Sequence, residues 1–450
     1  MFRFTLVMTM CLIYMIHSYK SNSIIEVLFP AITLIVFIAV IISMKGKARI
    51  FTLVLFISGM IIHFLNGNRG FNLLEGITQN LALLTILILA PLISIPLKHE
   101  GIIDSIVFSF TKNLNDERKS FYGVSSFMLL LTPILNMGSI RIVHGFVGNI
   151  GFQPKILTSA YFTGFTFAVL WSPFFASVGI VISILHISYM SYFFVGVIFA
   201  FIQVVVAILL LRPKASIYEK TENTTEQSAE IEVDTSKSKN ILLLLAFVLG
   251  LLLLLIGMES LLKKPMLLLV SFICILVPLV WILFRRKWSV AKSEYKLFKS
   301  NLLLNNRMEI TLFLSAGLFG NAIANTPMVN VLGSIIEWSV QESLAILFSF
   351  ILLFVTAMAI IGVHQIISVP LILMTLVETG IAYNPITIAF MCVFSWMLSS
   401  SVSPLNALNI IISQNARENG VKVAIMWHGI YFLTTTCIAF MYIYIIDFLT

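Results

Sequence analysis

Charged side chains are scarce in this sequence. Of its 450 residues, 11% are Asp, Glu, Lys or Arg, 59% are hydrophobic, and the mean hydropathy is +1.02. Soluble globular domains carry about 25% charged residues, so the composition excludes a soluble protein and predicts one that lies within a membrane. A bilayer core takes roughly 20 apolar residues per helix. Such runs recur along almost the whole chain and leave no room for a soluble catalytic domain.

Acidic residues and cysteines are also few, and each shortage excludes a kind of site. The apolar stretches carry almost no carboxylate away from their ends, although carriers of protons or metal cations usually need a buried one. The four cysteines are spread one per apolar stretch, without the paired spacing of a zinc site or a disulfide framework. We therefore expect no metal centre and no cofactor, and a site that favours anions.

The apolar stretches predict an all-α, polytopic membrane protein with about eleven transmembrane helices. The basic clusters sort to one side if the segments at 121–150 and 342–380 re-enter rather than cross, and we read that side as the cytoplasm. The basic pair left on the other side is Lys263 with Lys264. This reading places the N-terminus in the cytoplasm and the C-terminus outside it, in an inner membrane, with no nucleic-acid partner. The basic stretch 285–300 is read as a cytoplasmic surface helix near anionic lipid. We place apolar segments near 3–18, 24–44, 50–66, 79–98, 121–150, 155–185, 189–211, 240–258, 266–285, 308–326, 342–380, 386–414 and 423–446.

A polar stretch divides the chain almost in half. Residues 212–240 are mixed in charge and nearly free of large apolar residues, as is typical of a flexible linker. One constant shift along the chain superposes three prolines of the first half on three of the second: Pro96 on Pro327, Pro154 on Pro385, and Pro173 on Pro404. Five crossings separate equivalent points, so the two copies should face opposite ways. We predict a leading helix (1–20), a first inverted repeat (21–211), a cytoplasmic linker (212–240) and a second repeat (241–450).

Four stretches should contain non-helical backbone at membrane depth, which survives only where it is buried in protein or lines a polar cavity. The turns at 132–139 and 361–370 are read as tips of re-entrant hairpins. Pro173 and Pro404 should each break a helix, because proline lacks an N–H and clashes with the preceding turn. The free backbone groups can bind a ligand or an ion. The predicted substrate-binding residues are Asn136, Gly138, Ser139, Arg141, Ser172, Ser177, His364, Gln365, Ser368, Ser403 and Asn406, and the predicted ion-binding residues are Asn136, Gly179, Ser401 and Asn409.

Arg141 and His144 are unusual in an otherwise apolar stretch. An arginine at the centre of a membrane helix costs about 2.5–3.5 kcal/mol. Arg141 should therefore either face the site and meet an anionic substrate, or extend to the cytoplasmic interface beside Lys155. His144 and His364 are read either as core histidines or as substrate or proton-relay groups. The sequence offers no nucleophile with a base and orienting acid, so we expect no enzyme.

Three stretches resemble the ion transporter superfamily of secondary carriers, above all the divalent anion/sodium symporters and their arsenite, citrate and TRAP large-permease relatives. They are LKHEGIIDSIV (97–107), FQPKILTSAYFTGFTFAVLWSPFFASVG (152–179) and YNPITIAFMCVFSWMLSSSVSPLNALN (383–409). That family usually carries Ser-Asn-Thr at its hairpin tips, where this sequence has NMGS (136–139) and HQIIS (364–368). The resemblance implies a transport domain of hairpins and broken helices that slides past a scaffold. It also implies sodium contacts at the tips and a homodimer.

The sequence therefore predicts a secondary active transporter that moves a small anion, with a carboxylate as the first expectation. It would use an elevator-type alternating-access mechanism coupled to sodium or protons. Its partners would be the substrate, the lipid bilayer and a second copy of the chain. One alternative is a membrane-embedded envelope-synthesis enzyme, a polymerase or ligase acting on lipid-linked substrates. Such enzymes usually have a large extracytoplasmic loop, whereas the long loop here is cytoplasmic by charge. The other alternative is a sensory relative that does not transport.

Overall fold

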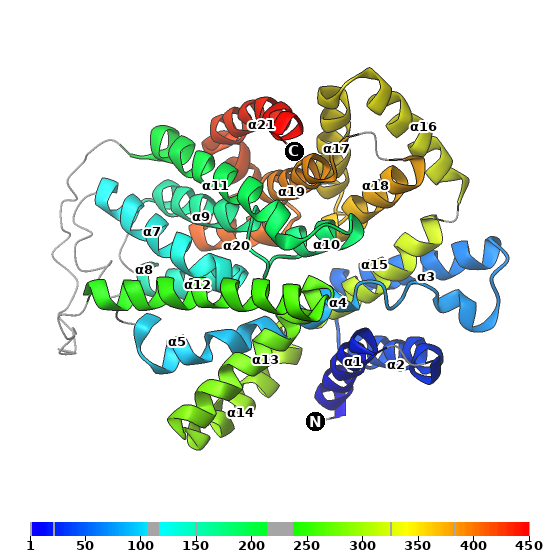
Figure 1. Ribbon diagram of the computed structural model, residues 1–450, viewed down its shortest axis with the longest axis horizontal. Coiled ribbons are helices and arrows are strands. Elements are labelled where there is room, and N and C mark those ends of the chain that lie inside the picture. The colour runs from blue at the N-terminus through cyan, green and yellow to red at the C-terminus, as the bar shows by residue number, and fades with distance from the viewer. Residues whose placement is uncertain are drawn as a thin grey trace.

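The described part of the computed structural model is all-helical (Figure 1), which confirms the all-α part of the predicted fold class. The structure describes residues 2–20, 23–103, 105, 117–148, 152–213, 237–324, 326–380 and 383–449, and this part of the chain forms helices and no strand. Several helical segments are long and apolar enough to cross a membrane, which indicates a multi-pass membrane protein. Within the described ranges seven such segments occur: Phe2–Tyr19, Leu81–His99, Tyr189–Leu211, Asn240–Leu262, Met266–Arg285, Pro385–Ala416 and Gly429–Leu449.

The first half begins with long single helices and continues with shorter, interrupted ones. Most boundaries fall within a few residues of the predicted ones. Local signals account for several starts: Pro154 occupies the first turn of α9, where its missing N–H costs nothing, and the Ser188 hydroxyl caps α11 by accepting the Ser191 N–H. The helices are α1 (Phe2–Tyr19), α2 (Ser23–Ile41), α3 (Lys47–Leu65), η1 (Gly70–Leu74), α4 (Leu81–Leu89), η2 (Ala90–Ser94), α5 (Ile95–His99), α7 (Glu117–Leu135), α8 (Met137–Val147), α9 (Pro154–Val169), α10 (Ala176–Ile184) and α11 (Tyr189–Leu211).

The second half follows a similar order. Pro385 opens α19 as Pro154 opens α9, and Asn384 caps that helix by accepting the Ile386 N–H. The predicted linker lies largely outside the described residues. The helices are α12 (Lys237–Leu262), α13 (Met266–Arg285), α14 (Trp288–Asn305), α15 (Arg307–Ala324), α16 (Pro327–Glu342), α17 (Leu344–Ile360), α18 (Gln365–Thr379), α19 (Pro385–Val402), α20 (Ala407–Ala416), the π-helix η3 (Lys422–Trp427) and α21 (Gly429–Leu449).

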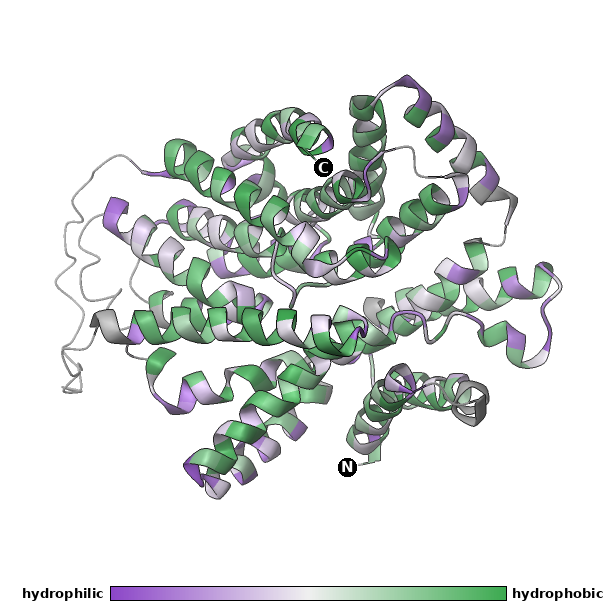
Figure 2. Cartoon of the chain, in the orientation of Figure 1, coloured by the Kyte–Doolittle hydropathy of each residue, from purple (hydrophilic) through white to green (hydrophobic). Residues whose placement is uncertain are grey.

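The helices form two groups that come from both halves of the chain (Figure 1). The leading group contains α1–α5 and α12–α15, in which α3 packs along α15 and α4 packs against α13. The broken-helix group contains α7–α11 and α17–α21, in which α7 packs along α9 and α17 along α19. Figure 2 shows apolar residues along most helices and hydrophilic residues gathered at many of their ends, the pattern expected of membrane helices.

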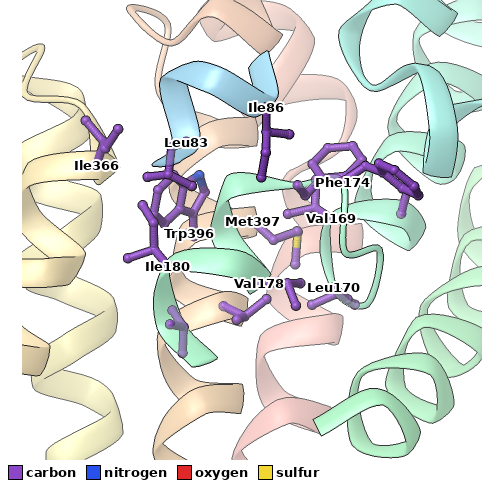
Figure 3. Packing of buried hydrophobic residues seen from close by; sticks show 14 of the residues in the cluster. Leu83, Ile86, Val169, Leu170, Phe174, Val178, Ile180, Ile366, Trp396 and Met397 are labelled. Carbon is purple, nitrogen blue, oxygen red and sulfur yellow. The ribbon is translucent and has the colours of Figure 1, made fainter. Parts of the chain in front are cut away.

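Among the seven long apolar segments of the described residues, α19–α20 is the most enclosed. In its most apolar stretch 89% of the residues are buried, compared with 22% for Asn240–Leu262, which contains most of α12. The surrounding core includes Leu83 and Ile86 of α4, Phe174 beside α10, and Trp396 of α19 (Figure 3). The broken helices therefore occupy the centre of the fold, and helices such as α12 expose their apolar side chains, as lipid contact requires.

Candidate functional site

Both helices that contain a Ser-Pro pair are interrupted at that pair, as predicted. Residues 170–175, which include Pro173, separate α9 from α10, and residues 403–406, which include Pro404, separate α19 from α20. A proline cannot donate the next helical hydrogen bond, so the helix ends there. The starts of α9 and α19 are related by the same offset as the starts of α10 and α20, and this is the offset that relates the prolines.

The two interruptions contain the same small turn. Ser172 Oγ accepts the Phe174 N–H at 3.3 Å, and Ser403 Oγ accepts the Leu405 N–H at 3.2 Å. A serine hydroxyl that binds the N–H two residues ahead is a recognised turn that replaces a helical hydrogen bond. Both serines are fully buried. The Ser-Pro sequence thus gives each break a defined shape rather than a loose loop.

Each of these serine hydroxyls also reaches a second interrupted element. Ser172 Oγ donates to the carbonyl of Pro133 in the last turns of α7 at 2.6 Å, and Ser403 Oγ donates to the carbonyl of Ala359 near the end of α17 at 2.7 Å. The helix α7 is followed at once by α8, and α17 is followed closely by α18. Each break is therefore fastened to the joint between two consecutive helices.

The joint between α7 and α8 is a single residue. Asn136 has a φ of 51°, in the left-handed region that few side chains tolerate, and its Oδ1 caps α8 by accepting the Met137 N–H at 2.7 Å. The buried Ser139 hydroxyl lies 3.0 Å from Thr132 Oγ1 and donates to the Asn136 carbonyl at 2.6 Å. Gly138 lies beside them, partly exposed. Three of the predicted residues meet here, and their hydrogen bonds hold the joint.

The joint between α17 and α18 turns at Gly362, which has a φ of 95° that favours glycine. His364 caps α18 by accepting the Ile366 N–H on Nδ1 at 3.1 Å. Its ring lies near those of Phe313 and Trp396, with centroids 6.5 and 6.2 Å away. His364 is therefore a capping side chain in an aromatic setting.

Hydroxyl groups satisfy the carbonyls of the first break. Residues 169–171 lie where α9 ends, and their carbonyls accept hydrogen bonds from the Ser177, Tyr192 and Tyr189 hydroxyls at 2.9, 2.8 and 2.9 Å respectively. Both tyrosines belong to α11 and are fully buried. The buried indole N–H of Trp171 has no hydrogen-bond partner among the described residues. The first break therefore leaves a donor unpaired, while its carbonyls are occupied.

Amide groups surround the second break. Gln365 Nε2 donates to Ser399 Oγ at 3.0 Å, and Gln365 Oε1 accepts from Asn406 Nδ2, also at 3.0 Å. Asn406 in turn caps α20 by accepting the Leu408 N–H at 3.0 Å. Gln365 is fully buried and Asn406 nearly so. This network joins the first residue of α18 to both sides of the second break.

Two predicted residues of the second half keep buried polar atoms unpaired. Ser368 Oγ and Asn409 Oδ1 have no hydrogen-bond partner in the part of the chain that the structure describes. Asn409 Nδ2 donates to the carbonyl of Gly420 at 3.2 Å, which fixes the amide and leaves its oxygen free. The Ser401 hydroxyl donates to a carbonyl of its own helix. A free buried hydroxyl and a free buried carbonyl oxygen are the groups a ligand or an ion can use.

The remaining predicted residues lie outside these networks. Arg141 is exposed on α8, where it attracts Glu309 in the first turn of α15. His144 Nδ1 lies 3.0 Å from the Tyr161 hydroxyl, which joins α8 to α9. Gly179 is buried, and a side chain there would come within 2.2 Å of Leu267 in α13. Arg141 thus lies on an exposed side of α8, and Gly179 permits close helix packing.

A small pocket lies between the two helix groups, and it was not predicted from the sequence. It is lined by Gln79 and Asn80 before α4, by Ala316 and Gly320 of α15, and by apolar residues of α18. Asn80 Nδ2 donates to the carbonyl of Phe313 at 3.2 Å, and Gln79 Nε2 contacts the sulfur of Met374 at 3.7 Å. None of the predicted site residues lines this pocket. Two amides before an apolar helix were the available signal.

The two broken helices pack against each other in a reciprocal way. The helix α10 contacts α18 and α19, and α20 contacts α8 and α9. Figure 3 shows apolar side chains from both around the first break, including Val169, Leu170 and Phe174 from one and Trp396 and Met397 from the other. In this conformation apolar side chains of both broken helices pack around the first break.

Comparison with models of protein families finds no match for this chain, and comparison with curated proteins finds none either. The class of protein therefore follows from the fold and the site alone. The chain is an all-α, multi-pass membrane protein with two interrupted helices at its centre.

Proposed function

We propose that this protein is a secondary active transporter that moves a small anion, preferably a carboxylate, across the cytoplasmic membrane by elevator-type alternating access. The broken-helix group would carry the solute and slide along the leading group, and a sodium or proton gradient would drive the movement. A homodimer stays a prediction from the resemblance. One observation carries the proposal. Each half of the chain has a helix break at the equivalent position, and a serine hydroxyl fastens each break to the joint of a helix pair.

The repeated break supports a duplicated module with two inverted copies. Both Ser-Pro turns have the same internal hydrogen bond. The starts of α9 and α19, and those of α10 and α20, are separated by the same number of residues. The packing supports an axis between the copies, since α10 contacts α18 and α19 while α20 contacts the corresponding α8 and α9. Exchange of equivalent partners is what a two-fold relation produces. Inverted copies around such an axis are common in carriers that alternate their access.

The energetic cost of a broken helix supports a ligand-handling role. Non-helical backbone at membrane depth is tolerated only where protein or a polar cavity satisfies it. A protein that needed only to span the bilayer would gain nothing from two such interruptions in its buried interior. Under this proposal, the α7–α8 and α17–α18 pairs are the re-entrant hairpins.

The unpaired groups of the second half are the best candidates for direct contact. The free Ser368 hydroxyl can donate to an anion, and the free Asn409 carbonyl oxygen is the hard ligand that a sodium ion prefers. Arg141 would supply charge recognition once an anion competes with Glu309 for it. The pocket between Asn80 and α18 lies where a carrier group would slide along its scaffold.

Uptake into liposomes tests the proposal. The purified protein should accumulate at least one of succinate, citrate, sulfate or arsenite when an inward sodium or proton gradient is imposed. Gln365→Met removes both amide hydrogen bonds at nearly constant volume, and we expect it to lower uptake at least tenfold. Arg141→Ala should abolish uptake.

A matched control removes one positive charge elsewhere. Arg69 is exposed, and its guanidinium contacts the Phe64 ring and the Phe64 and Asn68 carbonyls, all close to it in sequence, so Arg69→Ala should leave uptake unchanged. Uptake that survives Arg141→Ala would remove that residue from the site. No gradient-driven uptake of any of the four solutes by well-folded protein would overturn the proposed function.

A further inference from the structure

The helix α14 lies at one end of the membrane-spanning part of the protein. It connects α13, which ends at Arg285, to α15, which begins at Arg307. The Phe4 ring at the start of α1 packs edge-on against Tyr295 and Phe298 of α14, with centroids 5.8 and 6.0 Å apart. Because α1 has 18 residues, it is about 27 Å long, close to the thickness of a bilayer core. The α14 end of α1 is therefore near a membrane surface.

The opposite end of α1 marks the other surface. There the Tyr19 carbonyl accepts a hydrogen bond from Lys264 at 2.7 Å, and the Tyr19 ring packs against Phe272. Lys20 and Lys263 belong to the same end. The two ends of α1 thus lie beside two basic clusters about one bilayer apart, and the cluster at α14 is built on a helix.

The inner side of α14 is occupied by the protein. Leu302 is buried and Phe298 is half-buried against α1. Glu294, the only acidic residue of the helix, is paired with Lys98 at 3.2 Å and lies 2.7 Å from His99 Nε2. Lys98 and His99 therefore balance the charge of Glu294, which does not pair with the lysines of the outer side.

The outer side of α14 combines aromatic rings with lysines. Trp288, Lys292 and Lys299 lie on one face of the helix with Lys296 beside them. Tyr295, whose ring also packs against Phe4, lies at the edge of that face. Trp288 is 63% exposed and Tyr295 57%, although large aromatic side chains are normally buried. The three lysines form no ion pair with any described residue. We call this set the α14 face.

We propose that the α14 face binds the headgroups of anionic phospholipids. Tryptophan and tyrosine are enriched at membrane–water boundaries, where their rings rest at headgroup level, and lysine side chains extend from there into water. Since apolar helices flank α14 on both sides, headgroups are the ligands at hand. Three unpaired ammonium groups favour phosphate diesters with a net negative charge over zwitterionic ones. This binding does not depend on transport.

Lipid binding to the detergent-purified full chain tests this assignment. The apparent dissociation constants of phosphatidylglycerol and phosphatidylcholine would be measured by native mass spectrometry. The wild-type protein should prefer phosphatidylglycerol. Each lysine attracts anionic lipid, so Lys292→Gln, Lys296→Gln and Lys299→Gln together should weaken that preference by at least about fivefold. Trp288→Ala should weaken the binding of both lipids.

A matched triple variant separates the α14 face from the overall charge. Lys20→Gln, Lys263→Gln and Lys264→Gln remove the same charge at the opposite end of α1 and should leave the preference intact. Both triple variants alter exposed or surface groups, and unchanged melting temperatures in lipid-free detergent would confirm their folding. A wild-type protein without preference, or an equal loss in both triple variants, would overturn the assignment.

Discussion

The two helix breaks have the same Ser-Pro turn but different surroundings. Around the first break, the Tyr189, Tyr192 and Ser177 hydroxyls occupy the carbonyls that end α9. Around the second, Gln365 and Asn406 form an amide network, and buried oxygen atoms remain free nearby. In the described part of the chain, the first break therefore has its carbonyls occupied and the Trp171 N–H free, whereas the free groups of Ser368 and Asn409 in the second half are oxygen atoms.

The difference has a physical origin in the side chains that reach each break, tyrosines of α11 at the first and Gln365 of α18 at the second. A phenolic hydroxyl is fixed at the end of a rigid ring, so the tyrosines of α11 supply donors that hold the first break in one shape. Amides present both donors and acceptors and can exchange one partner for another. We infer that the second break is the adaptable one and the first is its fixed counterpart.

Removal of the tyrosine hydroxyls should have the largest effect on stability. Tyr189→Phe with Tyr192→Phe leaves two buried carbonyls without partners, which costs about 1–3 kcal/mol for each. The double variant should show a clearly lower melting temperature in detergent, and Tyr444→Phe, an exposed control, should not. Uptake per folded molecule should stay near the wild-type value. A strong loss of uptake by folded protein would show that the first break is not merely structural.

Crowding beside the first break should have a smaller effect. A side chain at Gly164 would lie 2.2 Å from the Met128 Cβ and 2.9 Å from its carbonyl carbon, so Gly164→Ala should cost about 1–3 kcal/mol. At the equivalent position of the second half, given by the offset of the prolines, lies Ser395, a buried residue with an unpaired hydroxyl. Ser395→Ala should be tolerated. Gly145→Ala is the control, since nothing lies within 4 Å of a side chain there. Equal melting temperatures for all three variants would contradict the difference in packing.

The serine hydroxyls should show the smallest and most informative difference. The Met137 N–H, the usual helical donor to the Pro133 carbonyl, is held by Asn136, so Ser172 replaces it. The Ala359 carbonyl also accepts the Gly362 N–H at 3.1 Å and keeps that bond without Ser403. Ser172→Ala should therefore cost about 1–2 kcal/mol and Ser403→Ala less. Thermal unfolding of the two variants measures this difference. A larger loss of stability for Ser403→Ala than for Ser172→Ala would contradict it.

Much of the fold could be predicted from the sequence, because a membrane helix is identified by a local run of apolar residues. Runs of apolar residues located the helices, and proline at Ser172-Pro173 and Ser403-Pro404 located the breaks. The site was harder to predict. Asn136, Gln365 and Asn406 were chosen for their polarity in apolar surroundings, and their contacts join elements up to 41 residues apart. The pocket at Asn80 and the role of the α11 tyrosines had no local signal of comparable strength.

By itself the sequence determined that this chain is helical, resides in a membrane and has two interruptions at a fixed spacing. Charged groups are costly in hydrocarbon, and so are backbone groups that lose their hydrogen bond where a proline lacks the N–H. Those features follow from these costs. Only the tertiary structure decided which polar atoms are paired. It brought Tyr192 to one break, left the Ser368 hydroxyl free in α18, and exposed Arg141 on α8. A hydrogen bond depends on where two distant segments meet, and apolar periodicity along the chain carries no record of that.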